Sequence, residues 1–159
     1  VLLSTMYFAE GAEDLPYSSD EFNEFMATID PTACTDDEQR IEQAYNLWLA
    51  TSKGSLPLDT QRIRELALLD VLHSPNYASR INHSYAQVTG DEITRINEIN
   101  APTLVIHGTD DVVIPTAHGE ALAAAIPGAQ LHIMEGSGHE LHPSYYSCVV
   151  GWIADTFLP

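Results

Sequence analysis

Residues 102–142 constrain the fold of this chain more than any other stretch. They open with β-branched and apolar residues at 103–106, which predict a buried strand. An alanine-rich amphipathic segment at 116–126 predicts a helix, and a short apolar run at 131–134 predicts a second strand. A strand–helix–strand unit of this length is typical of two parallel strands joined by a right-handed crossover. We therefore expect an α/β fold built on a parallel sheet.

Both predicted strands end in residues that can carry catalysis. The first breaks at Gly108 and is followed by Asp110 and Asp111, and the second is followed by Gly-Ser-Gly and then His139. Functional groups gather beyond the carboxyl ends of parallel strands. A histidine can shuttle a proton, and a carboxylate bonded to its other ring nitrogen fixes its tautomer. The sequence therefore predicts an acid–histidine pair at this edge of the sheet.

The same stretch resembles the last third of an α/β-hydrolase. Pro-Thr-Leu-Val-Ile-His-Gly-Thr-Asp-Asp-Val-Val-Ile-Pro at 102–115 and Glu-Gly-Ser-Gly-His-Glu-Leu at 135–141 are most similar to the aclacinomycin methylesterases and cofactor-free haloperoxidase-like esterases. That family carries a triad in the order serine, acid, histidine. The resemblance implies that Asp111 is the catalytic acid, with Asp110 as the alternative acid, and that His139 is the base. It implies neither a cofactor nor a metal.

The nucleophile of this triad is not found in the chain. The family places it in Gly-x-Ser-x-Gly, and no serine here has glycine two residues before and two residues after it. Ser52 follows a helical pattern, and Ser137 is too close in sequence to His139. We therefore expect the serine upstream of Val1, in an N-terminal half, and we expect this chain alone to be inactive. An aspartate nucleophile, as in dehalogenases or epoxide hydrolases of the same fold, would also lie upstream.

Three parts are expected along the chain. Residues 1–11 begin with an apolar run that resembles the core strand after the nucleophile helix of the family. Residues 12–95 contain helical patterns without a convincing strand, which indicates a helical lid (cap) inserted into the core. Residues 96–159 form the C-terminal core. Their last helix begins near Pro143, and we expect one side of it to be buried: Tyr146, Val149, Val150, Trp152, Ile153 and Phe157.

Helix-start signals divide the lid. Ser19 or Asp20, the Thr-Asp-Asp-Glu run at 35–38, and Asp59 are N-cap candidates, and Pro75 opens a fourth segment that ends at Gly90. The aromatic residues of these segments either line a substrate pocket or pack helix against helix. They are Phe22, Phe25, Tyr45, Trp48, Tyr77 and Tyr85. Three histidines outside the pair, His107, His118 and His132, are interpreted as structural.

Composition excludes several classes of partner. The chain has 23 acidic residues against 6 basic ones and a formal net charge of −17, which argues against nucleic acid and anionic membranes. No apolar run approaches the roughly 18–20 residues that span a bilayer.

Cys34 and Cys148 suggest no disulfide framework, so buried thiols in a cytoplasmic protein are expected. With 159 residues, the chain is short for a fold that usually needs about 200–250.

The predicted function is hydrolysis of a carboxylic ester by acyl transfer to water, with a small hydrophobic methyl or aromatic ester as substrate. The alternative is a non-catalytic hydrolase-fold fragment that binds a ligand or a partner. The alternative predicts exposed apolar faces at residues 1–6 and 131–134, where neighbouring strands are expected to be missing. In either case we expect self-association or association with a complementary N-terminal half.

Overall fold

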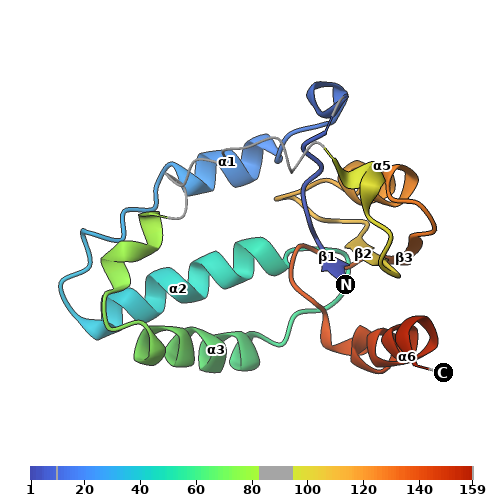
Figure 1. Cartoon of the computed structure of the whole chain (residues 1–159). Helices are drawn as coiled ribbons and strands as arrows, with labels where there is room; N and C mark the ends of the chain where they lie inside the picture. The colour runs from blue at the N-terminus through green and yellow to red at the C-terminus, as the bar shows by residue number, and fades with distance from the viewer. Residues whose placement is uncertain (10, 83–94, 159) are drawn as a thin grey trace.

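The computed structural model describes residues 1–9, 11–82 and 95–158 (Figure 1). Its sheet has the order β1-β2-β3, and both neighbouring pairs are parallel. These strands are β1 (Leu2–Leu3), β2 (Leu104–Gly108) and β3 (Gln130–Met134). In the register, Leu2 stands opposite Val105, which stands opposite Leu131. The parallel pairing of β2 with β3 confirms the expected strand–helix–strand unit and places the first residues of the chain beside it.

Helices cover both faces of the central strand β2, all five residues of which are buried. On one face, Val105 packs with Leu122 and Ile126 at α5 (Ala117–Ala125). On the other, Leu104 and Ile106 pack with residues of α6 (Tyr146–Phe157). Continuous burial instead of alternation is typical of a parallel strand enclosed by two helical layers. The protein therefore has the three-layer arrangement expected of an α/β fold.

The described part of the segment between β1 and β2 contains helices joined by loops, and no strand. Its helices are α1 (Asp20–Met26), α2 (Asp37–Ser52) and α3 (Thr60–His73). Each begins at a predicted cap, because the side chains of Ser19, Asp36 and Asp59 accept the backbone N–H of the third residue that follows. The fourth predicted segment shows a 3-10 helix at Tyr77–Ile81, and the rest of it falls mainly in 83–94, outside the described residues. Further 3-10 turns lie at Ala12–Asp14, Ile96–Glu98 and Pro143–Tyr145.

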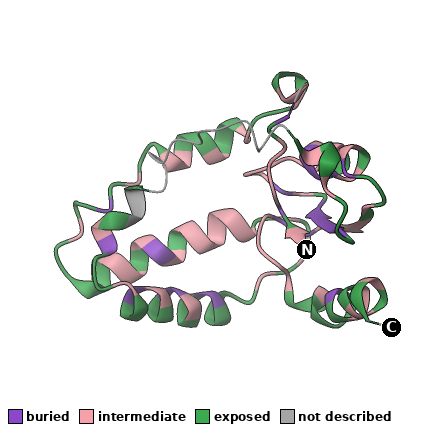
Figure 2. Ribbon diagram, viewed as in Figure 1, coloured by how far each residue is buried: buried purple, intermediate pink, exposed green. Residues whose placement is uncertain are grey.

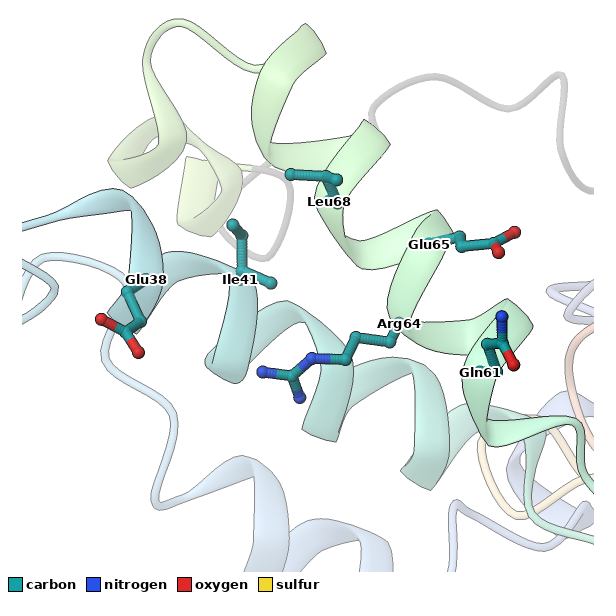
Figure 3. A pocket seen from close by; sticks show the side chains of 6 residues that line it. All are labelled: Glu38, Ile41, Gln61, Arg64, Glu65 and Leu68. Atoms are coloured by element: carbon teal, nitrogen blue, oxygen red, sulfur yellow. The ribbon is translucent and has the colours of Figure 1, made fainter.

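Helices α2 and α3 pack against each other around small residues. Ala44 and Ala67 are fully buried between them, together with Val71 and Tyr77. Tyr45 lies at the edge of this cluster and Arg64 stacks over its ring, 5.2 Å from the ring centre. The two tyrosines therefore pack helix against helix. A groove of about 480 Å³ runs along the outer side of the helix pair (Figure 3), and no residue of the strand-end loops lines it.

The expected burial of α6 is wrong for most of the residues proposed. Val149 is buried, but Tyr146, Val150, Ile153 and Phe157 are exposed, with 68% of Val150 accessible to solvent. Figure 2 shows that exposed residues recur along α6. The reason is the width of the sheet, because three strands cover only the side of α6 that carries Val149. We call the four exposed residues the α6 stripe.

The burial of two further segments also differs from expectation. Val1 and Leu3 are exposed at the β1 edge, as the alternative function requires, but Met134 is fully buried. Met134 packs with Leu104 beneath α6, whereas the three residues before it are half-buried, so the apolar face expected at 131–134 is only partly exposed. Cys148 is exposed instead of buried, and both cysteines are free.

Two features are absent from the described ranges. None of the helices in these ranges combines the length and the apolar character needed to cross a membrane. Within the same ranges, no group of three or more His, Cys, Asp and Glu residues is arranged to hold a metal ion.

Candidate active site

Backbone contacts join the loops that follow β2 and β3. The N–H of Thr109 donates to the carbonyl of Met134 (3.1 Å), and the N–H of Asp110 donates to that of Ser137 (3.0 Å). The Thr109 hydroxyl accepts the N–H of Gly136 at 2.8 Å. At Gly108, a Cβ would overlap the carbonyl oxygen of Ser137, so only glycine allows this approach. These contacts fix the acid loop and the histidine loop relative to each other.

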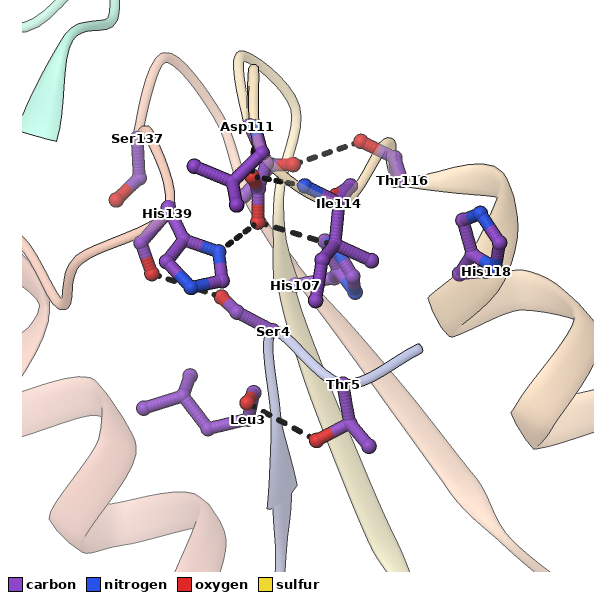
Figure 4. A network of polar contacts seen from close by, with 12 residues as sticks. Leu3, Ser4, Thr5, His107, Asp111, Ile114, Thr116, His118, Ser137 and His139 are labelled. Atoms are coloured by element: carbon purple, nitrogen blue, oxygen red, sulfur yellow. Dashed lines mark hydrogen bonds and ion pairs between the residues drawn. The ribbon is translucent and has the colours of Figure 1, made fainter. Parts of the chain in front are cut away.

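Asp111 and His139 meet where the two loops converge. The Nδ1 of His139 lies 2.9 Å from Oδ2 of Asp111 (Figure 4). The other carboxylate oxygen accepts the backbone N–H groups of Val113 and Ile114 at 2.9 and 2.8 Å, which orients the buried side chain. Because Nδ1 faces a carboxylate, it carries the proton, and Nε2 is left as the basic nitrogen. The His139 side chain is 24% exposed.

Asp110 has a different partner. Its Oδ2 accepts the backbone N–H of Ser55 at 2.7 Å and also the Ser55 hydroxyl. The geometry therefore separates the two aspartates, and it is Asp111, named as the acid from the resemblance, that meets the histidine.

The two partners shift each other's pKa in opposite directions. Burial acts to raise the pKa of Asp111, but hydrogen bonds from His107, His139 and the Ile114 backbone outweigh it and hold this pKa well below its ordinary value. Burial likewise acts to lower the pKa of His139, yet the hydrogen bond and charge of Asp111, with the charge of Glu140, raise it. A carboxylate that stays ionised and a histidine that readily takes a proton are what general base catalysis requires.

His107 is a second partner of the acid. Its Nε2 lies 2.7 Å from the carbonyl of Ile114 and 3.3 Å from Oδ2 of Asp111. Both neighbours are acceptors, so Nε2 carries the proton and Nδ1 is unprotonated. Nδ1 is buried and has no hydrogen-bond partner among the described residues. The interpretation of His107 as merely structural missed this contact. Its only sequence signal is the spacing of four residues between His107 and Asp111 across the strand end.

Ser4 supports the histidine from the neighbouring strand. It follows β1 with a φ of 46°, a left-handed conformation uncommon for any residue except glycine. Its buried hydroxyl donates to the backbone carbonyl of His139 at 2.9 Å (Figure 4). Nothing in the local sequence marks this role.

The other histidines and the serine considered in the sequence make contacts that hold the fold together and do not reach the Asp111–His139 pair. His118 accepts the N–H of Tyr7 and lies 3.0 Å from the Pro16 carbonyl, so it joins two loops. His132 stacks on Trp152, with ring centres 4.4 Å apart. The hydroxyl of Ser137 donates to the carbonyl of Glu140.

Two of the cavities beside the loops are lined by expected aromatic residues. One of about 140 Å³ is lined by Phe22 and Phe25 of α1, Ala50 of α2, and Val112 of the acid loop. The other, of about 270 Å³, is lined by Trp48 and by residues 140–143, which follow the candidate base. Three of the expected aromatic residues thus line cavities near the pair, and Tyr85 lies outside the described residues.

A parallel sheet with helices on both faces and polar loops at the carboxyl ends of its strands places the chain in the class of α/β proteins, which includes the α/β-hydrolase fold. The family model described as "Serine aminopeptidase, S33" (Hydrolase_4) matches residues 28–143. The chain belongs to this family of hydrolases, which confirms the resemblance seen at residues 102–142.

Individual relatives extend this result. The rhodomycin D methylesterase DnrP of Streptomyces peucetius is 29% identical over 131 residues, covering 80% of this chain and 43% of the relative. A 2-hydroxy-6-oxononadienedioate/2-hydroxy-6-oxononatrienedioate hydrolase of Cupriavidus pinatubonensis is 43% identical over 67 residues, which are 42% of this chain and 23% of that protein. The chain thus spans less than half the length of these relatives.

Solved structures show the same fold. The esterase RhEst1 from Rhodococcus sp. ECU1013 matches 98% of this chain and 55% of its own, with a TM-score of 0.65 at 20% identity. The meta-cleavage product hydrolase CumD of Pseudomonas fluorescens IP01 matches 98% of this chain and 53% of its own, with a TM-score of 0.64 at 19% identity.

Proposed function

We propose that this chain supplies the acid and the base of a serine hydrolase that cleaves carboxylic esters by acyl transfer to water. The observation that carries the proposal is the 2.9 Å hydrogen bond between His139 Nδ1 and Asp111 Oδ2. A serine hydroxyl would attack the ester carbonyl while Nε2 of His139 takes its proton. The same nitrogen would return that proton to the departing alkoxide and then take a proton from a water molecule that attacks the acyl-serine. It would give this second proton to the serine oxygen as the carboxylic acid leaves. Asp111 would stabilise the imidazolium in both steps.

The nucleophile in this proposal lies outside the sequence. The hydroxyls of Ser4 and Ser137 donate to the backbone carbonyls of His139 and Glu140, so both are engaged away from the basic nitrogen. The greater length of the matched relatives leaves room for a serine elsewhere. The polypeptide that carries it is the proposed partner, and the β1 edge is the expected contact because its outer side has no strand neighbour among the described residues.

A small hydrophobic ester is the proposed substrate. The 140 Å³ cavity combines the rings of Phe22 and Phe25 with Val112, which directly follows the candidate acid. A matched relative is named a methylesterase, which favours a methyl ester within this class. We also propose that the helices between β1 and β2 act as a lid. Two of them, α1 and α2, line the 140 Å³ cavity together with the acid loop.

A fluorophosphonate probe tests the proposal directly. The protein is treated with the probe and its intact mass is measured under denaturing conditions. A labelled species heavier than 17.5 kDa, or a labelled second polypeptide, would support serine chemistry. A single unlabelled species of 17.5 kDa without ester hydrolysis would overturn it. Hydrolysis without labelling would instead assign the aspartate nucleophile of the alternative hydrolase class.

A non-catalytic, partner-binding role is the second candidate. The observation that favours it is the exposed α6 stripe together with Val1 and Leu3 at the open edge of β1. A helix that keeps four large apolar residues in water is typical of an interaction surface. Light scattering tests this role. If the chain is a non-catalytic binding domain, we expect it to self-associate or to form a stable complex, and we expect the probe not to label it. A monodisperse, unlabelled monomer would contradict it.

A further inference from the structure

The last two residues of α2 and the turn that follows them, together residues 51–56 and called turn 51–56 below, lie directly on the histidine loop. The backbone N–H of His139 donates to the carbonyl of Thr51 at 2.9 Å, and the N–H of Leu56 donates to that of Gly136 at 3.2 Å. The carbonyl of His139 is in turn held by the Ser4 hydroxyl. Both backbone polar groups of His139 are therefore occupied, one by turn 51–56 and the other by the end of β1. The ring can then reorient only through its own side-chain torsions.

The contact between turn 51–56 and the histidine loop is a close approach of two backbones. A Cβ at Gly54 would overlap the carbonyl oxygen of Gly136 and lie 3.0 Å from the N of Gly138. A Cβ at Gly138 would overlap the carbonyl oxygen of Lys53. Neither segment can carry a side chain at this contact without moving. The atoms that a Cβ would meet belong to the backbone, so they cannot rotate away as a side chain could. Any displacement of the turn is thus transmitted to residues 136–139.

The turn is also anchored to the acid loop. Ser55 presents both its backbone N–H and its hydroxyl to one carboxylate oxygen of Asp110. The Ser55 hydroxyl is the main cause that lowers the pKa of Asp110, against a smaller opposing effect of burial, so this carboxylate is ionised at neutral pH. Thr109 adds a third donor to the same side chain, at 3.0 Å. Charge-assisted bonds of this kind are stronger than neutral ones.

We propose that turn 51–56 is a positioning element for His139, with Asp110 and Ser55 as its anchor. The turn joins the lid helices to both strand-end loops, so it links the placement of the lid to the placement of the candidate base. Asp110 then has a defined task, although it does not contact the histidine. The proposal rests on the proposed function only in treating His139 as the base, because the contacts themselves are independent of any reaction.

The clearest test is Ser55→Ala, which removes one anchor without changing any charge. We expect the His139 amide to exchange with solvent roughly fivefold faster or more, the effect of losing about one hydrogen bond. We also expect the pKa of His139, followed by NMR titration of its ring, to fall toward the ordinary value as its contact with Asp111 loosens. Glu140 and His107, the other titratable groups near the pair, keep their places in this variant. Ser79→Ala is the matched control, because among the described residues the Ser79 hydroxyl donates to the carbonyl of Asn76, three residues before it.

Gly54→Ala is the second variant, and Gly151→Ala is its control, because a Cβ at Gly151 meets nothing within 4 Å. We expect Gly54→Ala to change the same two readouts further in the same direction, while Gly151→Ala changes neither. If folded Ser55→Ala and Gly54→Ala proteins both keep the wild-type His139 exchange rate and titration, the positioning role is refuted. The probe-labelling experiment is independent of this outcome. A shift in the histidine titration without any labelling would remove the proposed function and leave the positioning role intact.

Discussion

Replacing His107 by phenylalanine tests how the candidate acid is held. The side chain is fully buried, and its Nε2–H is shared between the Ile114 carbonyl at 2.7 Å and Asp111 Oδ2 at 3.3 Å. Phenylalanine keeps an aromatic ring in the space but removes the donor. Leaving a buried acceptor without its donor costs about 1–3 kcal/mol. The wild-type ring already carries a buried Nδ1 without a described partner, and its removal offsets part of this cost. We expect a net loss of about 1–2 kcal/mol in the free energy of unfolding.

The same substitution has a second effect with a defined sign. Asp111 loses one of the donors that lower its pKa, and its carboxylate then attracts the His139 proton more strongly. The pKa of His139 therefore rises further, whereas general loosening of the site would lower it. Urea unfolding measures the first effect, and NMR titration of the His139 ring measures the second.

Two variants control this experiment. His107→Gln retains an N–H donor, so we expect it to restore part of the lost stability and to leave the His139 titration near that of the wild type. His132→Phe also replaces a strand histidine, but His132 stacks on Trp152 of α6 and phenylalanine can keep that stacking, so both readouts should stay unchanged. A stable His107→Phe protein in which the pKa of His139 falls would refute the reasoning, because it would mean that His107 does not bond to the acid.

Three further results are expected. In the complete hydrolase, Asp111→Asn lowers kcat for ester hydrolysis roughly 10⁴-fold, because it removes the partner that fixes the histidine tautomer, and Asp110→Asn lowers it far less. Met134→Ala, at a fully buried site beneath α6, lowers the free energy of unfolding in urea by about 2–5 kcal/mol. Stability also depends on pH in two ways. The contribution of Asp111, whose pKa is depressed, is present above its ordinary 3.8 and is lost as the pH falls through the lowered value. The contribution of His139, whose pKa is raised, is present below 6.5 and is lost as the pH rises through the raised value. Urea midpoints measured across the acid and neutral range should therefore pass through a maximum between these limits.

The sheet could be predicted because its signals are local. Residues 103–106 and 131–134 are short apolar runs, each ending at a turn, and the helix between them is long enough only for a parallel crossover. The N-caps at Ser19 and Asp59 are local in the same sense, because each cap bonds to a residue three positions ahead. Such features need no knowledge of the distant chain.

The preference for Asp111 over Asp110 rested on the family resemblance, because local signals of this kind do not distinguish the two residues. Adjacent residues on a turn point in different directions, and the direction depends on which backbone groups each carboxylate accepts. Asp111 accepts two N–H groups of the turn that follows, which directs its other oxygen to His139. Asp110 is directed outward to Ser55, which is 55 residues away in the sequence.

The residues that hold the backbone of His139 could not be predicted from the sequence for a related reason. Ser4 lies 135 residues before it, and neither Ser4 nor Thr51 belongs to a recognisable motif. Gly54 reads in the sequence as a helix breaker, whereas in the structure it also allows two backbones to touch. Contacts between distant segments leave almost no trace in the local pattern, so candidate positioning residues are seen only once the fold is known.

The last helix shows what an amphipathic pattern can and cannot determine. The pattern correctly identifies the residues of α6 that are apolar, and Val149 does pack against Leu104 and Ile106. It does not identify the neighbour that covers each of them, and the α6 stripe has none among the described residues that buries it. The stripe and Leu3 of β1 are therefore the surface that the proposed nucleophile-bearing polypeptide would have to cover. A substitution there should affect association with that polypeptide before it affects the Asp111–His139 pair, because α6 contributes no hydrogen bond to either side chain in the described contacts.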